Sequence, residues 1–330
     1  MMYFVNSDNK VVEVDATHAE SAYYKYMPNG SVVSTHWCSA EQLVLPSDAT
    51  CIVFDVVFDN PIDVYNYIVS MEYSVQTIIV TGIIKYYKNL PTNLKIQFFP
   101  FWALWSSDPH GTANILNNHH TFCCLPKKYK VSCLNGTAWP HRKLTYVYLK
   151  QKSYYDELVF SFHNRLTYHG HPTALVLTQK ENEQFNLLPQ FVTFKDDISF
   201  LDISINHPAY QETYVNLVTE TVVDNSSFLS EKTFKPIVAG QLFVLIAGPG
   251  AIQFLRDIGI DTFDDIIDNS YDNIVDIRER ITAALTQIDH LMTLDLEQLY
   301  IQIKPRLLHN SEYIRSDEFR QQFLLTFNTP

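Results

Sequence analysis

Short runs of β-branched and aromatic residues alternate with helix-like segments along this chain, and that alternation constrains the fold more than any other feature. Residues 50–58, 75–82 and 94–101 predict strands, and the segment 61–73 opens with Pro61, which the first turn of a helix tolerates. Strands separated by helices at this spacing pair in parallel. The first third of the chain therefore predicts a parallel α/β sheet.

The same alternation continues through the rest of the chain. We expect strands over residues 127–135, 157–162, 214–222 and 241–248, and helices over residues 140–152, 173–180, 231–240 and 250–259. Glycines end the last two of these helices, and residues 272–327 are mostly helical in pattern, whereas 181–207 shows no clear period. The polar segment near residues 120–127 divides the chain into two α/β domains, 1–125 and 126–330.

Composition narrows the functional classes. The chain has only nine glycines and contains neither GxGxxG nor GxxxxGK[ST], so Gly-rich dinucleotide and phosphate loops are excluded. A net charge of −12 gives no overall basic footprint for a polyanion. The odd count of five cysteines suits a reducing compartment, and no signal peptide or apolar run of about 18 residues is visible. We therefore expect a cytoplasmic protein without a membrane span.

The most informative segment begins a predicted helix. Ser230 is a good N-cap, and Glu231 and Lys232 occupy the first turn. Helix N-termini at the carboxyl ends of parallel strands bind phosphate and ribose in α/β folds. There Lys232 can neutralise a diphosphate and Glu231 can hold ribose hydroxyls. The alternative is that Glu231 is only a favourable first-turn carboxylate and Lys232 a solvated charge.

The sequence FLSEKTFKPI at 228–237, followed by Ala239-Gly240-Gln241, resembles the (T/S)-E-K motif of GT-B glycosyltransferases. The resemblance is to the donor-binding half of fucosyltransferase-like and exostosin-like enzymes and of related viral and phage proteins, and it extends from Lys127 onward. It implies two Rossmann-like domains with a cleft between them and a helical C-terminus. It also implies a UDP- or GDP-type nucleotide sugar, with Glu231 on the ribose and Lys232 on the diphosphate.

A second group of residues lies between the strand at 127–135 and the helix at 140–152. Asn135 and Gly136 end the strand, and Arg142 and Lys143 follow in the first helical turn. This resembles the loop of such transferases in which an arginine reaches the donor's diphosphate, a role that suits the planar guanidinium fork. The alternative is that both cations are ordinary surface charges. If the resemblance holds, Arg142→Ala and Lys232→Ala lose activity and stay folded.

Glycosyl transfer also needs a base for the acceptor hydroxyl, which the resemblance places in the N-terminal domain. The candidates at strand ends or in loops are Asp55, Asp59, Asp108 and His110. No Asp-x-Asp follows a predicted strand, so we expect a metal-independent reaction. A zinc site is disfavoured for the group His119, His120, Cys123, Cys124 and Cys133. Their spacing is not one of the usual structural pairs, and Cys133 lies in a predicted buried strand, where cysteine behaves as a small hydrophobic residue. The aspartates from Asp257 to Asp276 predict a solvated acidic face.

Two classes of acceptor molecule remain as alternatives, DNA bases and saccharides. The viral resemblance favours a phage enzyme that glycosylates 5-hydroxymethylated pyrimidines in double-stranded DNA, and KYYKNLPTNLK at 85–95 offers basic and aromatic contacts to a flipped base. Residues 1–125 contain five Lys, no Arg and eleven acidic residues, which suits a saccharide or lipopolysaccharide acceptor better. A non-catalytic α/β protein that binds a nucleotide or a carbohydrate is the alternative from another class.

Overall fold

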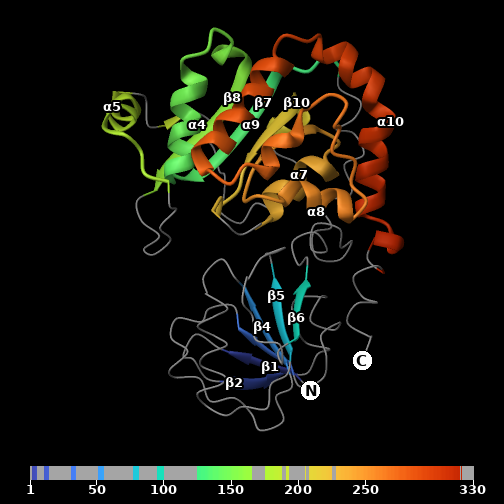
Figure 1. Ribbon diagram of the computed structural model, residues 1–330. Helices are drawn as coiled ribbons and strands as arrows, with labels where there is room; N and C mark the ends of the chain where they lie inside the picture. Colours follow the sequence, from blue (N-terminus) through green and yellow to red (C-terminus); the bar gives the residue numbers. More distant parts are fainter. Residues whose placement is uncertain are drawn as a thin grey trace.

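In the computed structural model of this 330-residue chain, two parts are described. Six strands are described in the first third. From residue 125 to 319 the description is nearly continuous, with gaps at 166–174, 188–190, 193–204, 206–207 and 225–227. The described strands form two sheets (Figure 1), and the strands of the first sheet all precede those of the second in the sequence. The segment predicted to separate two domains falls between these two sets of strands.

The first sheet has the strand order β2-β1-β3-β4-β5-β6. Its strands are β1 (Met2–Val5), β2 (Val11–Val14), β3 (Ser31–Ser34), β4 (Cys51–Asp55), β5 (Thr77–Thr81) and β6 (Lys95–Phe99). All neighbours pair in parallel except β2, which is antiparallel to β1. The three strands predicted here are confirmed, and so is their parallel pairing.

The second sheet has the order β11-β10-β7-β8-β9. Its strands are β7 (Tyr129–Thr137), β8 (Leu158–Arg165), β9 (Phe191–Val192), β10 (Thr213–Thr219) and β11 (Leu242–Ile246). The first four in spatial order pair in parallel, and β9 is antiparallel to β8. All four strands predicted in this half are therefore present, and β9 is an addition to them.

The helices of the second half follow the predicted pattern, apart from the helix predicted at 173–180 and one short helix, at 208–211, that was not predicted. They are α4 (Pro140–Lys150), α5 (Gln179–Leu187), α6 (Pro208–Gln211), α7 (Glu231–Val238), α8 (Ala251–Asp257), α9 (Ile277–Leu291) and α10 (Leu296–Ile314). The predicted helix at 173–180 is wrong, because residues 175–178 are irregular and the helix begins at Gln179. There Thr178 acts as the cap: its hydroxyl accepts from the N–H of Glu181, whose carboxylate accepts from the N–H of Thr178 in return.

Two glycines end helices as the sequence predicts. Gly240 follows α7 with φ +63°, and Gly259 follows α8 with φ +87°. After α8, the N–H of Ile260 donates to the carbonyl of Leu255 at 2.9 Å, which closes the helix end in the left-handed turn that glycine favours. A Cβ on Gly259 would lie 2.8 Å from the ring of Tyr313 in α10, so this turn also lets α10 pack closely.

The order of the second sheet reverses direction at one place. The chain leaves β7, forms α4 and returns beside it as β8, whereas it leaves β10, forms α7 and continues on the other side as β11. Right-handed crossovers therefore place α4 and α7 on opposite faces. The contacts agree with this, since α4 packs against α9 and α7 packs against α10. The ends of β7 and β10 form a topological switch point, where open α/β sheets bind ligands.

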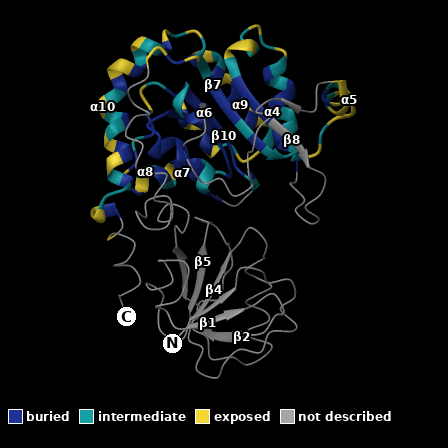
Figure 2. Cartoon of the chain, turned by 180° about the vertical axis from the view of Figure 1, so that it is seen from behind, coloured by how far each residue is buried: buried dark blue, intermediate teal, exposed yellow. Residues whose placement is uncertain are grey.

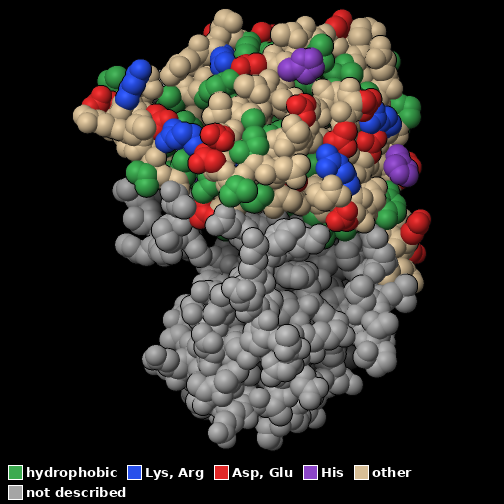
Figure 3. All heavy atoms as spheres, viewed as in Figure 1, with side chains coloured by type: hydrophobic (Ala, Val, Ile, Leu, Met, Phe, Trp, Pro, Cys, Tyr) green, Lys and Arg blue, Asp and Glu red, His purple; other side chains and the backbone are tan. Residues whose placement is uncertain are grey.

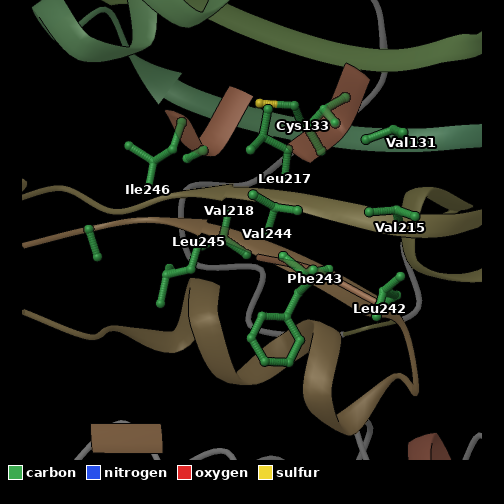
Figure 4. Close-up of a cluster of buried hydrophobic side chains, with 14 of the residues drawn as sticks. Val131, Cys133, Val215, Leu217, Val218, Leu242, Phe243, Val244, Leu245 and Ile246 are labelled. Carbon is green, nitrogen blue, oxygen red and sulfur yellow. The ribbon is translucent and has the colours of Figure 1, made fainter. Parts of the chain in front are cut away.

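The core of this half lies on the central strands. Every residue of β10 and β11 is buried, as expected for strands covered on both faces. Figure 4 shows side chains of β7, β10 and β11 gathered in this core, and Figure 2 shows buried strands between helices with exposed outer faces. Cys133 is buried here at 2% exposure, as predicted. Tight packing around β7 and β10 gives their carboxyl ends a rigid base.

Candidate functional site

The carboxyl ends of β7 and β10 are tied together by buried polar groups. The Thr219 hydroxyl donates to Oδ1 of Asn135, and the Asn135 N–H donates to the Ser161 hydroxyl at 3.1 Å. Asn135 also donates through Nδ2 to Sγ of Cys133 at 3.2 Å. Because its backbone N–H and both side-chain polar atoms are used inside the protein, Asn135 holds the strands together at this edge. Gly136 is half-buried and still belongs to β7.

The start of α7 confirms the predicted cap. Ser230 is extended, with φ −111° and ψ −174°, and its hydroxyl accepts from the N–H of Lys232 at 3.4 Å. Beneath it lies Glu220, the residue after β10, which is fully buried. Glu220 accepts from the Ser230 N–H at 2.8 Å, from the Ser230 hydroxyl at 2.6 Å and from the Thr233 hydroxyl at 2.6 Å. The first turn of α7 is thus fixed to the end of β10.

Glu231 and Lys232 are the parts of this turn that solvent reaches. Their side chains are 19% and 33% exposed, and Lys232 Nζ lies 2.5 Å from a carboxylate oxygen of Glu231 and 3.2 Å from the Ser230 hydroxyl. Burial favours a raised pKa at Glu231, but attraction to Lys232 and Lys235 outweighs it and holds the pKa below its ordinary value. The turn therefore presents an ionised acceptor beside a cation, the groups that hydroxyls and phosphates require.

Arg142 is not a surface charge. Its side chain is 2% exposed, and its guanidinium donates to the carbonyls of Thr137 at 3.2 Å and Thr219 at 3.0 Å. Nε has no hydrogen-bond partner among the described residues. Burial lowers the pKa of Arg142 to about 10, against the opposing attraction of Glu220, so the group stays charged at neutral pH. Lys143, its neighbour, lies over the ring of Phe185.

His141 is the second buried group at the start of α4. It has no exposed surface, and Nε2 lies 2.8 Å from the carbonyl oxygen of Glu220. Since a carbonyl can only accept, Nε2 carries the proton and Nδ1 is left without a hydrogen bond in the described structure. Burial and the charge of Arg142 lower the pKa of His141 to about 3, so the ring is neutral. His141 and Arg142 thus join α4 to the end of β10.

A second buried arginine organises the neighbouring loops. Arg280 of α9 is 2% exposed and donates to the carbonyls of Ala247, Val223, Ile274 and Val275, which lie in three different loops. Ala247 follows β11 and Val223 follows β10, so the guanidinium holds loops at the same edge of the sheet. Burial lowers its pKa, while nearby aspartates oppose that effect. Two buried guanidinium groups therefore lie at the carboxyl edge of the sheet.

The predicted acidic face between Asp257 and Asp276 is wrong in part. Arg256 pairs with Asp264, and Arg306 pairs with both Asp261 and Asp265. Asp272 is 3% exposed and accepts from the N–H groups of Ile252 and Gln253 at 3.1 Å, which caps α8. Figure 3 shows charges of both signs side by side on this face of the described part. These aspartates therefore serve the packing of α8 and α10.

Several predicted site residues lie outside the described residues. These are the base candidates Asp59, Asp108 and His110, and also His119, His120, Cys123 and Cys124 of the disfavoured zinc site. Asp55 is the last residue of β4, paired with Thr81. Within the described ranges, no three His, Cys, Asp or Glu side chains gather so that they could hold a metal ion. None of the helices described here has the length and apolarity for a membrane crossing.

The sequence interpretation missed Glu220, His141, Thr219 and Arg280. Glu220 carried one visible signal, since it lies near the end of the predicted strand at 214–222 and precedes the cap residue Ser230 by ten positions. The signal was weak because most carboxylates at strand ends are solvated. A scan against models of known protein families finds no match, and a search among curated proteins finds none that is significantly similar.

Proposed function

We propose that this protein is a nucleotide-sugar-dependent glycosyltransferase of the metal-independent GT-B type. The observation that carries the proposal is the placement of Glu231 and Lys232, which stand partly exposed on the first turn of α7 beside the switch point between β7 and β10. Nucleotides bind at such edges in α/β folds. In the first sheet, by contrast, the described parallel strands lie in chain order and show no reversal.

In this proposal the exposed pair binds the donor. The carboxylate of Glu231 accepts hydrogen bonds from the ribose hydroxyls, and Lys232 leaves Glu231 to contact the diphosphate. The buried charge of Arg142 lies at the same strand ends and favours the negative charge of the leaving nucleoside diphosphate. Asn135 and Gly136 form the carboxyl end of β7 beside the donor, and Ser230 fixes the first turn of α7.

The acceptor half of the proposal rests on sequence. The N-terminal α/β domain supplies the base, with Asp59, Asp108 and His110 as candidates, and faces the donor domain across a cleft. We propose 5-hydroxymethylated pyrimidines in phage DNA as the acceptor, with saccharides as the alternative that the acidity of residues 1–125 favours.

The proposal is tested with purified full-length protein and a panel of UDP-, GDP- and other nucleotide sugars. Release of the nucleoside diphosphate, accelerated by an acceptor, supports it. Binding of a nucleotide sugar without transfer or hydrolysis, with every acceptor class present, supports a non-catalytic binding protein instead. Absence of both binding and turnover across the panel overturns the proposal. Salt-sensitive retention on hydroxymethylcytosine DNA separates the two acceptor classes, because phosphate contacts weaken as salt rises.

A further inference from the structure

Glu220 is a fully buried carboxylate to which the glycosyltransfer reaction assigns no chemical step. It follows the last residue of β10, and its two oxygens accept three hydrogen bonds at 2.6–2.8 Å. All three donors belong to Ser230 and Thr233, at the start of α7. A buried carboxylate is costly unless donors of this kind surround it, so the group is built into the first turn of α7.

The backbone of Glu220 makes two further connections. Its N–H donates to the carbonyl of Ile246 at the end of β11 at 2.9 Å, and its carbonyl accepts from His141 in the first turn of α4 at 2.8 Å. One residue therefore connects the end of β10 with the end of β11 and with the first turns of α4 and α7. These are the elements that meet at the switch point.

The contacts of Glu220 also decide which groups of α7 are left for a ligand. The Ser230 N–H is already bonded to Glu220, and the Lys232 N–H to the Ser230 hydroxyl. A carboxylate of the protein thus neutralises this helix end, where an anionic ligand would otherwise be stabilised. The side chains of Glu231 and Lys232 remain available, and their position depends on the turn that Glu220 holds.

We infer that Glu220 is a positioning residue, which fixes the first turn of α7 relative to α4 and so places Glu231 and Lys232 for the ligand. Its effect on the ligand rests on the proposed function, whereas its effect on the turn does not. Removal of Glu220 frees three donors and lets the first turn move. A displacement of about 1 Å at a site of this kind costs about a hundredfold in reaction rate.

Three variants at this contact and one control test the inference. Glu220→Ala removes all three acceptor contacts. Glu220→Gln keeps the shape, accepts from the Ser230 N–H and donates to the Ser230 hydroxyl. Thr233→Val removes one donor at nearly constant volume, which keeps the test open if Glu220→Ala does not fold. Gln241→Ala is the control, because buried Gln241 donates to the carbonyls of Ala209 and Thr213 near the opposite ends of β10 and β11.

Two measurements are made on each variant. Hydrogen exchange reports on the N–H groups of Ser230 and Lys232, and calorimetry gives the affinity for UDP and for GDP. We expect Glu220→Ala to speed exchange at both groups and to weaken binding about tenfold or more, with kcat/KM falling further. Glu220→Gln should stay within about threefold of the wild type because it keeps the turn bonded. Thr233→Val should lie between them, and Gln241→Ala should lower stability without weakening binding.

The outcomes separate the inference from the proposed function. Unchanged exchange at Ser230 and Lys232 in Glu220→Ala, or in Thr233→Val if Glu220→Ala does not fold, overturns the inference. Equal weakening of binding by Gln241→Ala also overturns it, because the effect would then be one of general stability. A wild-type protein that binds neither UDP, GDP nor any nucleotide sugar overturns the proposed function, and the exchange measurement still decides the positioning role.

Discussion

Glu220 holds Ser230 by two hydrogen bonds, one to its backbone N–H at 2.8 Å and one to its hydroxyl at 2.6 Å. The cap of α7 is therefore bonded to a buried carboxylate from the preceding strand, and not only to its own helix. This contact explains how a short helix with Pro236 inside it keeps a defined first turn. It also leaves Lys232 as the exposed cation of the turn.

Lys232→Ala should weaken binding of UDP or GDP by about tenfold without lowering the unfolding midpoint, because it removes one charge-assisted contact from a partly exposed position. Lys130→Ala is the matched control: Lys130 is 35% exposed and pairs with Glu157 at 2.7 Å, much as Lys232 pairs with Glu231. Calorimetry and thermal unfolding measure both variants. Equal affinities of the two variants for UDP and GDP would show that Lys232 does not contact the donor.

Removal of Arg142 should lower stability, whereas the sequence alone predicts a variant that stays folded and loses only activity. Arg142→Met should lower the free energy of unfolding by about 3 kcal/mol, because the carbonyls of Thr137 and Thr219 lose their buried donor. Urea unfolding measures the effect. Lys143→Met, one position on, removes a half-buried cation and should cost less than about 1 kcal/mol.

The Arg142→Met variant also tests whether the guanidinium contacts the donor directly. If Arg142→Met unfolds at the wild-type urea concentration but loses donor binding, the guanidinium contacts the ligand itself. If stability and binding fall together, and binding recovers at lower temperature where the fold is intact, the group acts through the strand ends that it holds.

Buried His141 should make stability depend on pH. Its pKa is about 3 in the folded protein and 6.5 ordinarily, so the unfolded chain takes up a proton first as the pH falls. The neutral ring therefore contributes its full stability above pH 6.5 and loses it as the pH falls towards 3, at up to about 1.4 kcal/mol per pH unit. Urea unfolding across this range should show a shallower loss in His141→Gln than in the wild type.

The control for this pH series is His309→Gln, since His309 is exposed on α10. This variant separates the loss of the buried ring from the loss of a histidine as such. A wild-type loss that His141→Gln leaves unchanged would assign the pH dependence to other groups.

Gly259→Ala should destabilise the protein by about 1–3 kcal/mol, because alanine is strained at φ +87° and its Cβ would lie 2.8 Å from the ring of Tyr313. The double variant Gly259→Ala/Tyr313→Ala separates the two causes. If the contact matters, the added cost of alanine at 259 is smaller in the Tyr313→Ala background. Equal costs in both backgrounds would leave backbone strain as the whole effect.

Much of the second half could be predicted from local pattern. The strands β7, β8, β10 and β11 are rich in β-branched and aromatic residues. The starts of α4 and α7 carry Pro140 and Ser230, which mark helix N-termini through a fixed φ and through a capping hydroxyl. The helix placed at 173–180 failed because its apolar residues suggested a period, whereas the cap at Thr178 decides where α5 begins.

The polar interior could not be predicted in this way. The sequence predicts Arg142 as a contact to the donor's diphosphate, or alternatively as a surface charge, and it assigns no role to Glu220. A sequence does not show whether a charged residue beside a strand end meets solvent or hydrogen-bond partners from another element. Glu220 and Ser230 are ten residues apart, whereas Arg142 and Thr219 are 77 apart. The contact between Arg142 and Thr219 forms only after the sheet has brought β7 and β10 together.

The sequence by itself therefore determined the elements, since periodicity, caps and terminating glycines act within a few residues. It also determined that Glu231 and Lys232 begin a helix after a parallel strand. The tertiary structure alone decided the strand order, and with it the switch point between β7 and β10. It also decided that Arg142, His141 and Glu220 are buried, because the free energy of burying a charged or polar group depends on the partners that distant segments supply.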